Sequence, residues 1–110
     1  MIRAARLRRS RDIAAVQKTG RALRRSAFVA RVRPSDLRSI RVAVTASRSI
    51  GTAVMRNRAR RRVREAFRRE LATASRTGID VLVAVRPEAV AAPFAALRAE
   101  VAGVLREGPG

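Results

Sequence analysis

Apolar residues between positions 52 and 75 recur every three or four residues, which is the spacing of an amphipathic α-helix. Arginines fill much of the rest of the same stretch. The pattern predicts one helix from about Thr52 to Ser75, ended by Thr77 and Gly78, with one face that packs and one that carries dense positive charge. The predicted packing face consists of Met55, Ala59, Val63, Ala66, Phe67, Leu71 and Ala74.

Three shorter segments carry the pattern of β-strands. Residues 27–32 and 40–46 alternate between apolar and other side chains, as half-buried strands do. Residues 79–85 are nearly all apolar, which favours an interior place in a sheet. A turn at residues 34–36 separates the first two segments, and a basic loop at residues 47–51 precedes the long helix.

Two further helices are predicted near the ends of the chain. Residues 10–19 place Ile13 and Val16 on one face, and Gly20 stops the helix. Pro93 opens a last helix, because proline suits the first helical position. The apolar face of that helix contains Phe94, Leu97, Val101, Val104 and Leu105.

This order of elements, α-β-β-(β)-α-β-α, predicts an α/β (α+β) two-layer sandwich in which helices cover one sheet. The strand–helix–strand stretch over residues 40–85 predicts a parallel pair of strands. We expect one domain over residues 1–110, with residues 1–9 as a basic N-terminal arm and residues 107–110 as a frayed tail. No apolar run reaches the ~20 residues that cross a bilayer, and the start lacks the apolar core of a signal peptide.

The net charge of +18 is extreme for 110 residues, and it is unevenly distributed. Residues 1–33 carry eleven basic residues and one acid, residues 56–69 carry eight and one, and residues 70–110 carry four and five. The last third therefore takes no part in the basic surface, which is typical of a charged binding region on a neutral foundation. Lys18 is the only lysine among the 26 basic residues. A coding bias explains that ratio better than function does, but it does not explain the clustering.

The densest cluster is residues 56–64, where six of nine residues are arginine. A merely solvated helix would interleave glutamates, yet Glu65 is the only acid between Asp36 and Glu70. Charge of this density repels itself unless it is solvated or meets a polyanion. The cluster therefore predicts contact with nucleic acid rather than solubility alone.

The composition excludes several kinds of catalytic site. The chain has no cysteine and no histidine, so disulfides, thiolate chemistry, a histidine base and Cys/His zinc sites are all excluded. The lack of cysteine fits a reducing, cytoplasmic setting. Ser47 and Ser49 have no histidine to activate them. The remaining carboxylates are scattered, without the paired spacing of metal-dependent nucleases: Asp12, Asp36, Glu65, Glu70 and Asp80.

Two features bear on how a nucleic acid would be held. The three aromatic residues, Phe28, Phe67 and Phe94, are too few for a base-stacking platform, so recognition must rest on phosphates, shape and arginine. Such binding weakens steeply with salt. Gly51 lies just before the long helix, where backbone amides can hold a phosphate or simply form a turn.

The stretch from Arg41 to Phe67 resembles the signature of the bacterial ribonuclease P protein subunit. That family carries a basic Ser-Lys/Arg loop, matched by Ser47-Arg48, and then Ile-Gly-x-Ala-Val, matched by residues 50–54. Its Arg-Asn-Arg-x-Lys/Arg-Arg helix is matched by residues 56–61. Upstream, Arg6-Leu7 and Asp12-Ile13 stand where the family has Arg-Leu and Asp-Phe, so the resemblance covers roughly residues 6–106.

The resemblance implies a specific function. The family's protein binds a large catalytic RNA and helps it remove the 5′ leader from precursor tRNA, and the RNA performs the hydrolysis with magnesium. The expected partners are therefore that RNA and precursor tRNA, with no membrane and no obligatory protein partner. Magnesium would be bound mainly by RNA and substrate. The family fold is ribosomal-protein-like with a left-handed βαβ crossover, whereas general rules favour a right-handed one.

The same resemblance assigns two groups of residues. Those expected to bind the catalytic RNA are Ser47, Arg48, Arg56, Asn57, Arg58, Arg60, Arg61 and Arg64. Those expected to line a leader-binding cleft between the first helix and the sheet are Arg6, Arg9, Ile13, Gln17, Phe28 and Arg31. The family's usual aromatic positions in the cleft fall on Ile13, Gln17 and Arg31. We therefore hypothesise that Arg31, with Phe28 nearby, replaces aromatic stacking by guanidinium stacking and phosphate contact.

Other functions fit the composition alone. A ribosomal protein or another factor that assembles structured RNA would have the same charge and class of fold. A DNA-compacting protein would share the charge but not the Ile-Gly-x-Ala-Val loop. A membrane-active helix is disfavoured because the apolar face is rich in alanine rather than leucine or tryptophan. A chain this basic would also gain stability from a bound polyanion.

Overall fold

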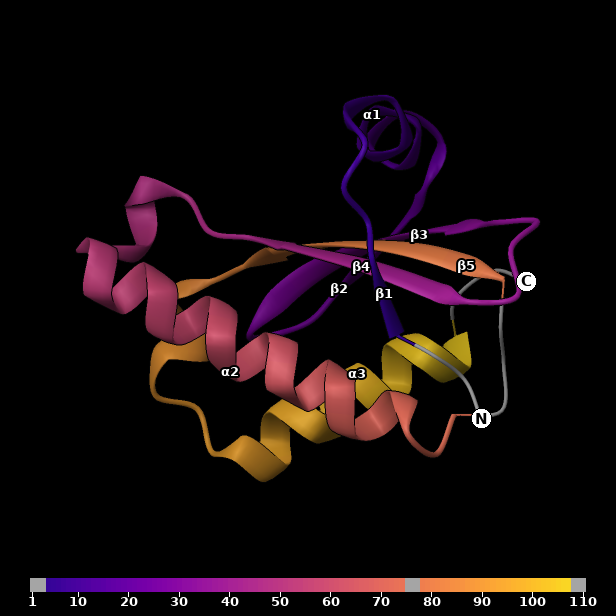
Figure 1. Ribbon diagram of the computed structural model, residues 1–110. Coiled ribbons are helices and arrows are strands. Elements are labelled where there is room, and N and C mark those ends of the chain that lie inside the picture. The colour runs from indigo at the N-terminus through magenta and orange to yellow at the C-terminus, as the bar shows by residue number, and fades with distance from the viewer. Residues whose placement is uncertain (1–3, 75–77, 108–110) are drawn as a thin grey trace.

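The computed structural model describes residues 4–74 and 78–107. The predicted long helix, the interior strand and the terminal helices are all present (Figure 1). The elements in chain order are β1 (Ala4–Arg6), α1 (Ser10–Thr19), β2 (Arg21–Arg24), β3 (Phe28–Pro34), β4 (Ile40–Thr45), the short 3₁₀ helix η1 (Arg48–Ile50), α2 (Ala53–Leu71), β5 (Ile79–Val85), the 3₁₀ helix η2 (Pro87–Val90) and α3 (Phe94–Glu107).

The strands form one five-stranded sheet in the order β1-β4-β5-β3-β2. β5 lies at its centre, as its apolar sequence predicts, parallel to β4 and antiparallel to β3. The parallel pair expected on either side of the long helix is therefore present. Strand β1 was not predicted. It pairs in parallel with β4 through residues 4–6, which the sequence analysis had placed in a basic arm.

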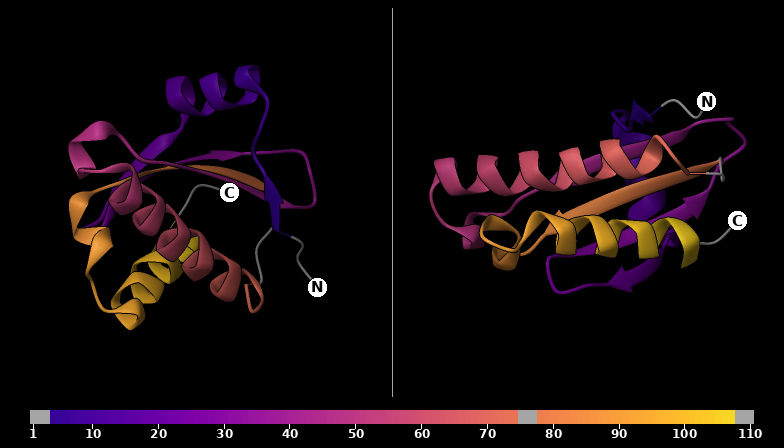
Figure 2. Two further views of the ribbon diagram at one scale, coloured as in Figure 1. Left: turned by 60° about the vertical axis from the view of Figure 1, so that its left-hand side comes forward. Right: turned by 90° about the horizontal axis from the view of Figure 1, so that it is seen from below.

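The connection from β4 through α2 to β5 is left-handed. Figure 2 (right) looks at the sheet from the side of α2 and α3. When this view is turned so that β4 and β5 point upward, β5 lies to the left of β4 while α2 crosses in front. This is the hand that the resemblance implies and the opposite of the general preference.

Helices cover both faces of the sheet. α2 and α3 lie on one face, where they enclose the main core with the two-layer packing expected from the sequence (Figure 1). The Phe28 and Phe67 rings meet there, with centroids 6.2 Å apart. α1 lies on the other face over β3 and β5. Its contact is small and involves the buried side chains of Leu7, Val16 and Leu82.

The start and end of α2 follow from local chemistry. The Thr52 hydroxyl accepts a hydrogen bond from the Met55 amide at 3.2 Å and so caps the helix. Gly51 precedes it at φ 134°, a region that favours glycine. Met55 belongs to the predicted packing stripe but is 39% exposed, because the first turn extends past the sheet.

α2 ends at Leu71 rather than Ser75, as the chain tightens into i→i+3 bonds to Glu70 and Leu71. Of the predicted tail at residues 107–110, Glu107 is instead the last residue of α3. Residues 108–110, like residues 75–77, lie outside the described residues.

A partly buried ion cluster fastens α1 to the sheet. The Arg41 guanidinium donates to both carboxylate oxygens of Asp80, at 2.7 and 2.6 Å, and to Asp12 of α1 at 3.2 Å. The Asp80 side chain is only 3% exposed, whereas that of Arg41 is 20% exposed. The hydrogen bond that Arg41 donates to Asp80 raises the pKa of Arg41, against the lowering effect of burial. Register pairs Arg41 with Asp80 across β4 and β5, so the sheet itself aligns the two side chains.

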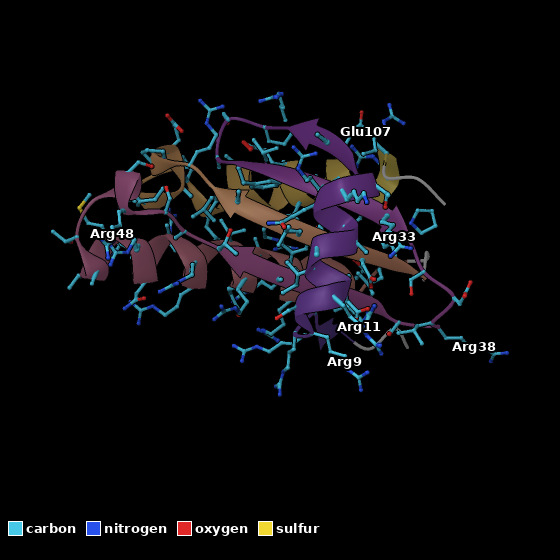
Figure 3. All side chains as sticks on the ribbon, turned by 90° about the horizontal axis from the view of Figure 1, so that it is seen from above. Arg9, Arg11, Arg33, Arg38, Arg48 and Glu107 are labelled. Carbon is cyan, nitrogen blue, oxygen red and sulfur yellow. The ribbon has the colours of Figure 1, made fainter. Side chains whose placement is uncertain are left out.

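We predict that Arg41→Ala lowers the free energy of unfolding by about 3 kcal/mol, because it leaves the Asp80 carboxylate buried without its partner. Urea denaturation of the purified protein measures this. Arg38→Ala is the matched control, since Arg38 is exposed on the loop after β3 (Figure 3). Equal unfolding free energies for the two variants would contradict the structural role of the cluster.

Candidate nucleic-acid interface

One side of α2 presents arginines that the fold does not use. Asn57, Arg60, Arg61 and Arg64 line a shallow groove along this helix together with Val54. The spacings of three and four residues place them on one side of an α-helix. Within residues 4–74 and 78–107, Arg61 and Arg64 make no hydrogen bond or ion pair with the protein, whereas Arg60 donates to the side-chain amide oxygen of Asn57. Their charge is therefore available to an external anion.

Other arginines of α2 hold the fold instead. Arg62 donates to the backbone carbonyls of Ala89, at 2.8 Å, and Ala92. Arg58 donates to the carbonyl of Val90 at 3.1 Å. These bonds tie α2 to the segment around η2. Arg58, assigned to RNA by resemblance, thus has a structural contact as well, although it remains exposed.

The loop before α2 lies at the end of the same helix. Arg48 is exposed at one end of the molecule, where Figure 3 labels it. The hydroxyls of Ser47 and Ser49 hydrogen-bond to each other at 2.6 Å. Arg56 donates to the Gly51 carbonyl at 3.1 Å, which ties the first turn of α2 to the loop. The predicted RNA-binding residues of the loop and the helix are therefore continuous in space.

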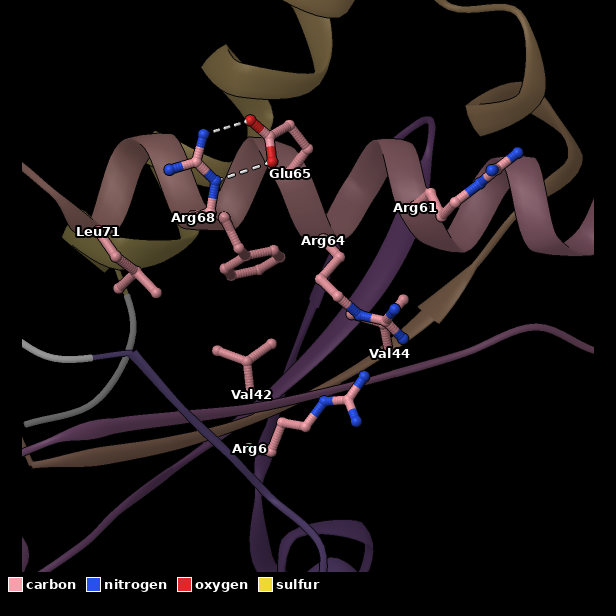
Figure 4. Close-up of a pocket in the computed structure, with 9 residues that line it drawn as sticks. Arg6, Val42, Val44, Arg61, Arg64, Glu65, Arg68 and Leu71 are labelled. Atoms are coloured by element: carbon pink, nitrogen blue, oxygen red, sulfur yellow. Dashed lines mark hydrogen bonds and ion pairs between the residues drawn. The ribbon is translucent and has the colours of Figure 1, made fainter.

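Ion pairs offset part of the positive charge at the far end of α2. Glu65 accepts bonds from Arg68 at 2.6 and 2.8 Å, drawn in Figure 4, and from Arg69 at 3.1 Å. The hydrogen bonds from Arg68 and then Arg69 lower the pKa of Glu65 to about 2. Arg69 also lies 5.5 Å above the centroid of the Phe94 ring. Free positive charge is thus concentrated over the first two thirds of the helix.

Arg6 does not lie where the sequence analysis placed it. Its register partner is Val42, whose side chain packs against the α2–α3 core, so Arg6 lies on the α2 face and not in the cleft beside α1. Its guanidinium group points toward that of Arg64 (Figure 4). Burial, with the charges of Arg6 and Arg60, lowers the pKa of Arg64 from its usual value. The interface therefore extends from α2 onto the edge strand.

Four of the predicted cleft residues do lie on the α1 side of the sheet. Ile13 is half-buried and packs against the small cluster of Leu7, Val16 and Leu82. Arg9, just before α1, and Gln17, within α1, are both exposed. Arg31 is half-buried on β3, directly beside the end of α1 at Gly20. This face therefore offers polar and cationic groups next to one apolar side chain.

Phe28 is a correction to the predicted cleft. It is fully buried and faces Phe67 on the opposite side of the sheet from α1. The reason is the alternation of β3, which directs Phe28, Ala30 and Val32 into the main core and Arg31 to the other face. Phe28 therefore cannot stack on a base beside Arg31.

Two other features are absent from the described residues. No three or more His, Cys, Asp or Glu side chains come together there to hold a metal ion. Among those same residues, no helix combines the length and apolar character needed to cross a membrane.

We predict that Glu65 makes stability depend on pH in a defined window. Its lowered folded pKa means that its ion pairs contribute fully above the ordinary value of 4.5 and are lost as the pH falls toward about 2. The unfolding free energy of Glu65→Gln should therefore approach that of the unchanged protein over this window. Denaturation at pH 7, 4 and 2 measures the gap, with Glu88→Gln as the control for removing an exposed carboxylate. A difference in unfolding free energy that stays constant across these pH values would contradict the role given to the Glu65 ion pairs.

The family model and the curated relatives that match this sequence all point to one protein family. A family model described as Ribonuclease P matches residues 1–108. The ribonuclease P protein component of Chloroflexus aggregans is 43% identical over 108 residues, which cover 97% of this chain and 79% of that protein. The component from Herpetosiphon aurantiacus is 40% identical over 86 residues, covering 78% of this chain and 69% of that protein.

Solved structures agree. The RNase P protein from Thermotoga maritima has a TM-score of 0.82 with this chain at 29% identity, covering 96% of this chain and 98% of that one. The Staphylococcus aureus RNase P protein has a TM-score of 0.76 at 23% identity, covering 94% of both chains, a likeness that concerns the fold alone. The predicted α+β class and element order are confirmed.

Proposed function

This chain belongs to the ribonuclease P protein family, and we propose that it binds the catalytic RNA of ribonuclease P through α2 and the loop before it. Membership confirms the resemblance of the sequence and makes the chain a component of a tRNA-processing endoribonuclease whose partner is the ribonuclease P RNA. What remains a proposal is how the protein contacts RNA and what each contact contributes.

One observation carries the proposal for α2. Arg61 and Arg64 are exposed and unpaired within the described residues, while Arg58 and Arg62 on the same helix bond to backbone carbonyls. A helix that needed arginine only for its fold would not leave two such groups side by side without a carboxylate. Guanidinium groups match phosphate oxygens in geometry and charge. The free arginines are therefore the groups we assign to the RNA backbone.

The opposite face is the proposed site for the 5′ leader of precursor tRNA. Arg31, Gln17 and Arg9 border the junction of α1 and the sheet, and Ile13 supplies an apolar contact. With Phe28 buried, no aromatic side chain takes part in our proposal. The leader would be held by phosphate contacts and by stacking on the Arg31 guanidinium plane.

Catalysis is assigned to the RNA. Within residues 4–74 and 78–107, no three or more carboxylates come together in one place. We propose that magnesium is bound by RNA and substrate, as the resemblance implies, and we assign no step to a protein-held ion. The protein would act by holding the RNA and the leader together. A cytoplasmic location is likewise a proposal.

The direct test is cleavage of a precursor tRNA by a bacterial ribonuclease P RNA at low magnesium, with and without the protein. We expect the protein to restore cleavage at the mature 5′ end, because its cations replace part of the counter-ion requirement. RNA binding without any effect on cleavage would instead favour a structured-RNA-binding assembly protein.

For α2, we predict that Arg61→Ala with Arg64→Ala weakens binding to the ribonuclease P RNA and flattens its salt dependence. Each lost phosphate contact reduces the slope of log K against log salt by about 0.7 to 0.9. Filter binding over a salt series measures both quantities. The double variant Arg86→Ala with Arg106→Ala, which removes two exposed arginines elsewhere, is the control. Equal slopes for the two double variants would refute the assignment.

For the leader, we predict that Arg31→Ala lowers the affinity of the reconstituted enzyme for precursor tRNA about tenfold, with little effect on mature tRNA. The ratio of the two affinities is the readout, because a general loss of folding or RNA binding would change both. Arg21→Ala, an exposed residue of β2, serves as the control. An unchanged ratio in Arg31→Ala would show that Arg31 does not contact the leader.

A further inference from the structure

A pocket of about 520 Å³ opens between the β1–β4 edge of the sheet and α2 (Figure 4). Its floor is apolar and consists of Val42 and Val44 of β4 with Phe67 and Leu71 of α2. Val42 and Val44 are only half-buried, so part of the floor is open to solvent. The volume falls within the range of about 300–1,000 Å³ that is usual for small-ligand sites.

The rim of this pocket is cationic. Arg6 and Arg64 approach it from opposite sides, with their guanidinium groups pointing toward each other, and Arg61 lies farther along α2 (Figure 4). The one carboxylate at the rim, Glu65, already accepts bonds from Arg68 and Arg69. Within the part of the chain that the structure describes, neither Arg6 nor Arg64 has an anionic partner. Two converging guanidinium groups repel each other until an anion lies between them.

An apolar floor beside a pair of free guanidinium groups matches one particular ligand chemistry. A nucleotide has a flat base that packs on apolar side chains and stacks on guanidinium planes. Its phosphate is joined to that base through the ribose and so lies close by. The rim is continuous with the free arginines of α2, since Arg61 and Arg64 line both the pocket and the groove along the helix. The pocket therefore lies on the path of any RNA strand that follows that groove.

We propose that this pocket receives a single unstacked base of the RNA held by α2, with the adjoining phosphate bound between Arg6 and Arg64. The inference rests on the proposed function for α2 and adds a mode of recognition to it. It assigns a role to Arg6, which lies on the opposite face of the sheet from the proposed leader site. The base belongs to the ribonuclease P RNA rather than to the leader, because α1 and Arg31 are on the other side of the sheet.

The pocket can be tested without any large RNA. Methyl NMR spectra of the protein are recorded during titration with adenosine monophosphate or uridine monophosphate. Ribose 5-phosphate serves as the probe without a base. We expect the nucleotides to shift the methyl signals of Val44 and Leu71, and ribose 5-phosphate to shift them much less. Signals of Leu37, which is 48% exposed away from the pocket on the loop between β3 and β4, should stay in place. Equal shifts with ribose 5-phosphate would overturn the base site and leave only an anion site.

Two variants separate the base from the phosphate. Val42→Met fills the pocket without changing charge, and Arg64→Ala removes one phosphate ligand at an exposed position. We expect Val42→Met to abolish the nucleotide shifts at Val44 and Leu71, and Arg64→Ala to weaken them. Spectra of both variants before titration establish that they are folded. If Val42→Met does not fold, Arg6→Ala, which changes another exposed arginine of the rim, replaces it. Unchanged nucleotide shifts in both Arg6→Ala and Arg64→Ala would then overturn the proposal.

Affinity for the ribonuclease P RNA then distinguishes this inference from the proposed function. We expect Val42→Met to bind that RNA about tenfold more weakly, which is the scale of one lost base contact. Its ratio of affinities for precursor and mature tRNA should not change. Tight binding that is identical in the unchanged protein and Val42→Met would refute the pocket while the proposed function stands. Failure of the unchanged protein to bind the RNA would refute the proposed function, and the nucleotide titration would still decide the pocket.

Discussion

Repulsion among the arginines of α2 is the constraint on which the rest of the structure depends. Residues 56–69 hold eight arginines and one glutamate on a single helix. The fold relieves part of this repulsion because some of the arginines donate hydrogen bonds to oxygen atoms of the protein. Arg58 and Arg62 donate to backbone carbonyls around η2, and Arg68 and Arg69 donate to Glu65. Arg61 and Arg64 are left facing solvent, so the charge that the fold does not absorb is gathered on one side.

The sheet keeps the two proposed RNA contacts apart. Alternation along β3 and β4 directs apolar side chains toward α2 and α3, and it directs Arg31 and Arg41 toward α1. Asp80 fixes Arg41, and through Asp12 it fixes α1 over the sheet. The proposed leader face is therefore held by this partly buried ion cluster, whereas the α2 face is held by the main core. A change on one face need not disturb the other.

Much of this arrangement could be predicted from the sequence, since periodicity identifies α2, a continuous apolar run identifies β5, and the parallel pair follows from the order of the elements. Phe28 was misplaced even though its alternation with Ala30 and Val32 already directs it inward. β1 could not be predicted, because three residues carry no usable period and its pairing with β4 is a long-range contact. For the same reason Arg6 was assigned to the wrong face. The bonds from Arg58 and Arg62 depend on where η2 lies, which no local pattern reveals.

We propose that neighbouring arginines of α2 divide between holding the fold and holding RNA. The most direct test compares Arg61→Gln with Arg62→Gln, each assayed for affinity to the ribonuclease P RNA well below its melting temperature. We predict that Arg61→Gln loses affinity with its melting temperature unchanged, and that Arg62→Gln melts earlier but binds RNA normally while folded. Equal losses of affinity in the two variants would contradict it, since the helix would then act only through its total charge.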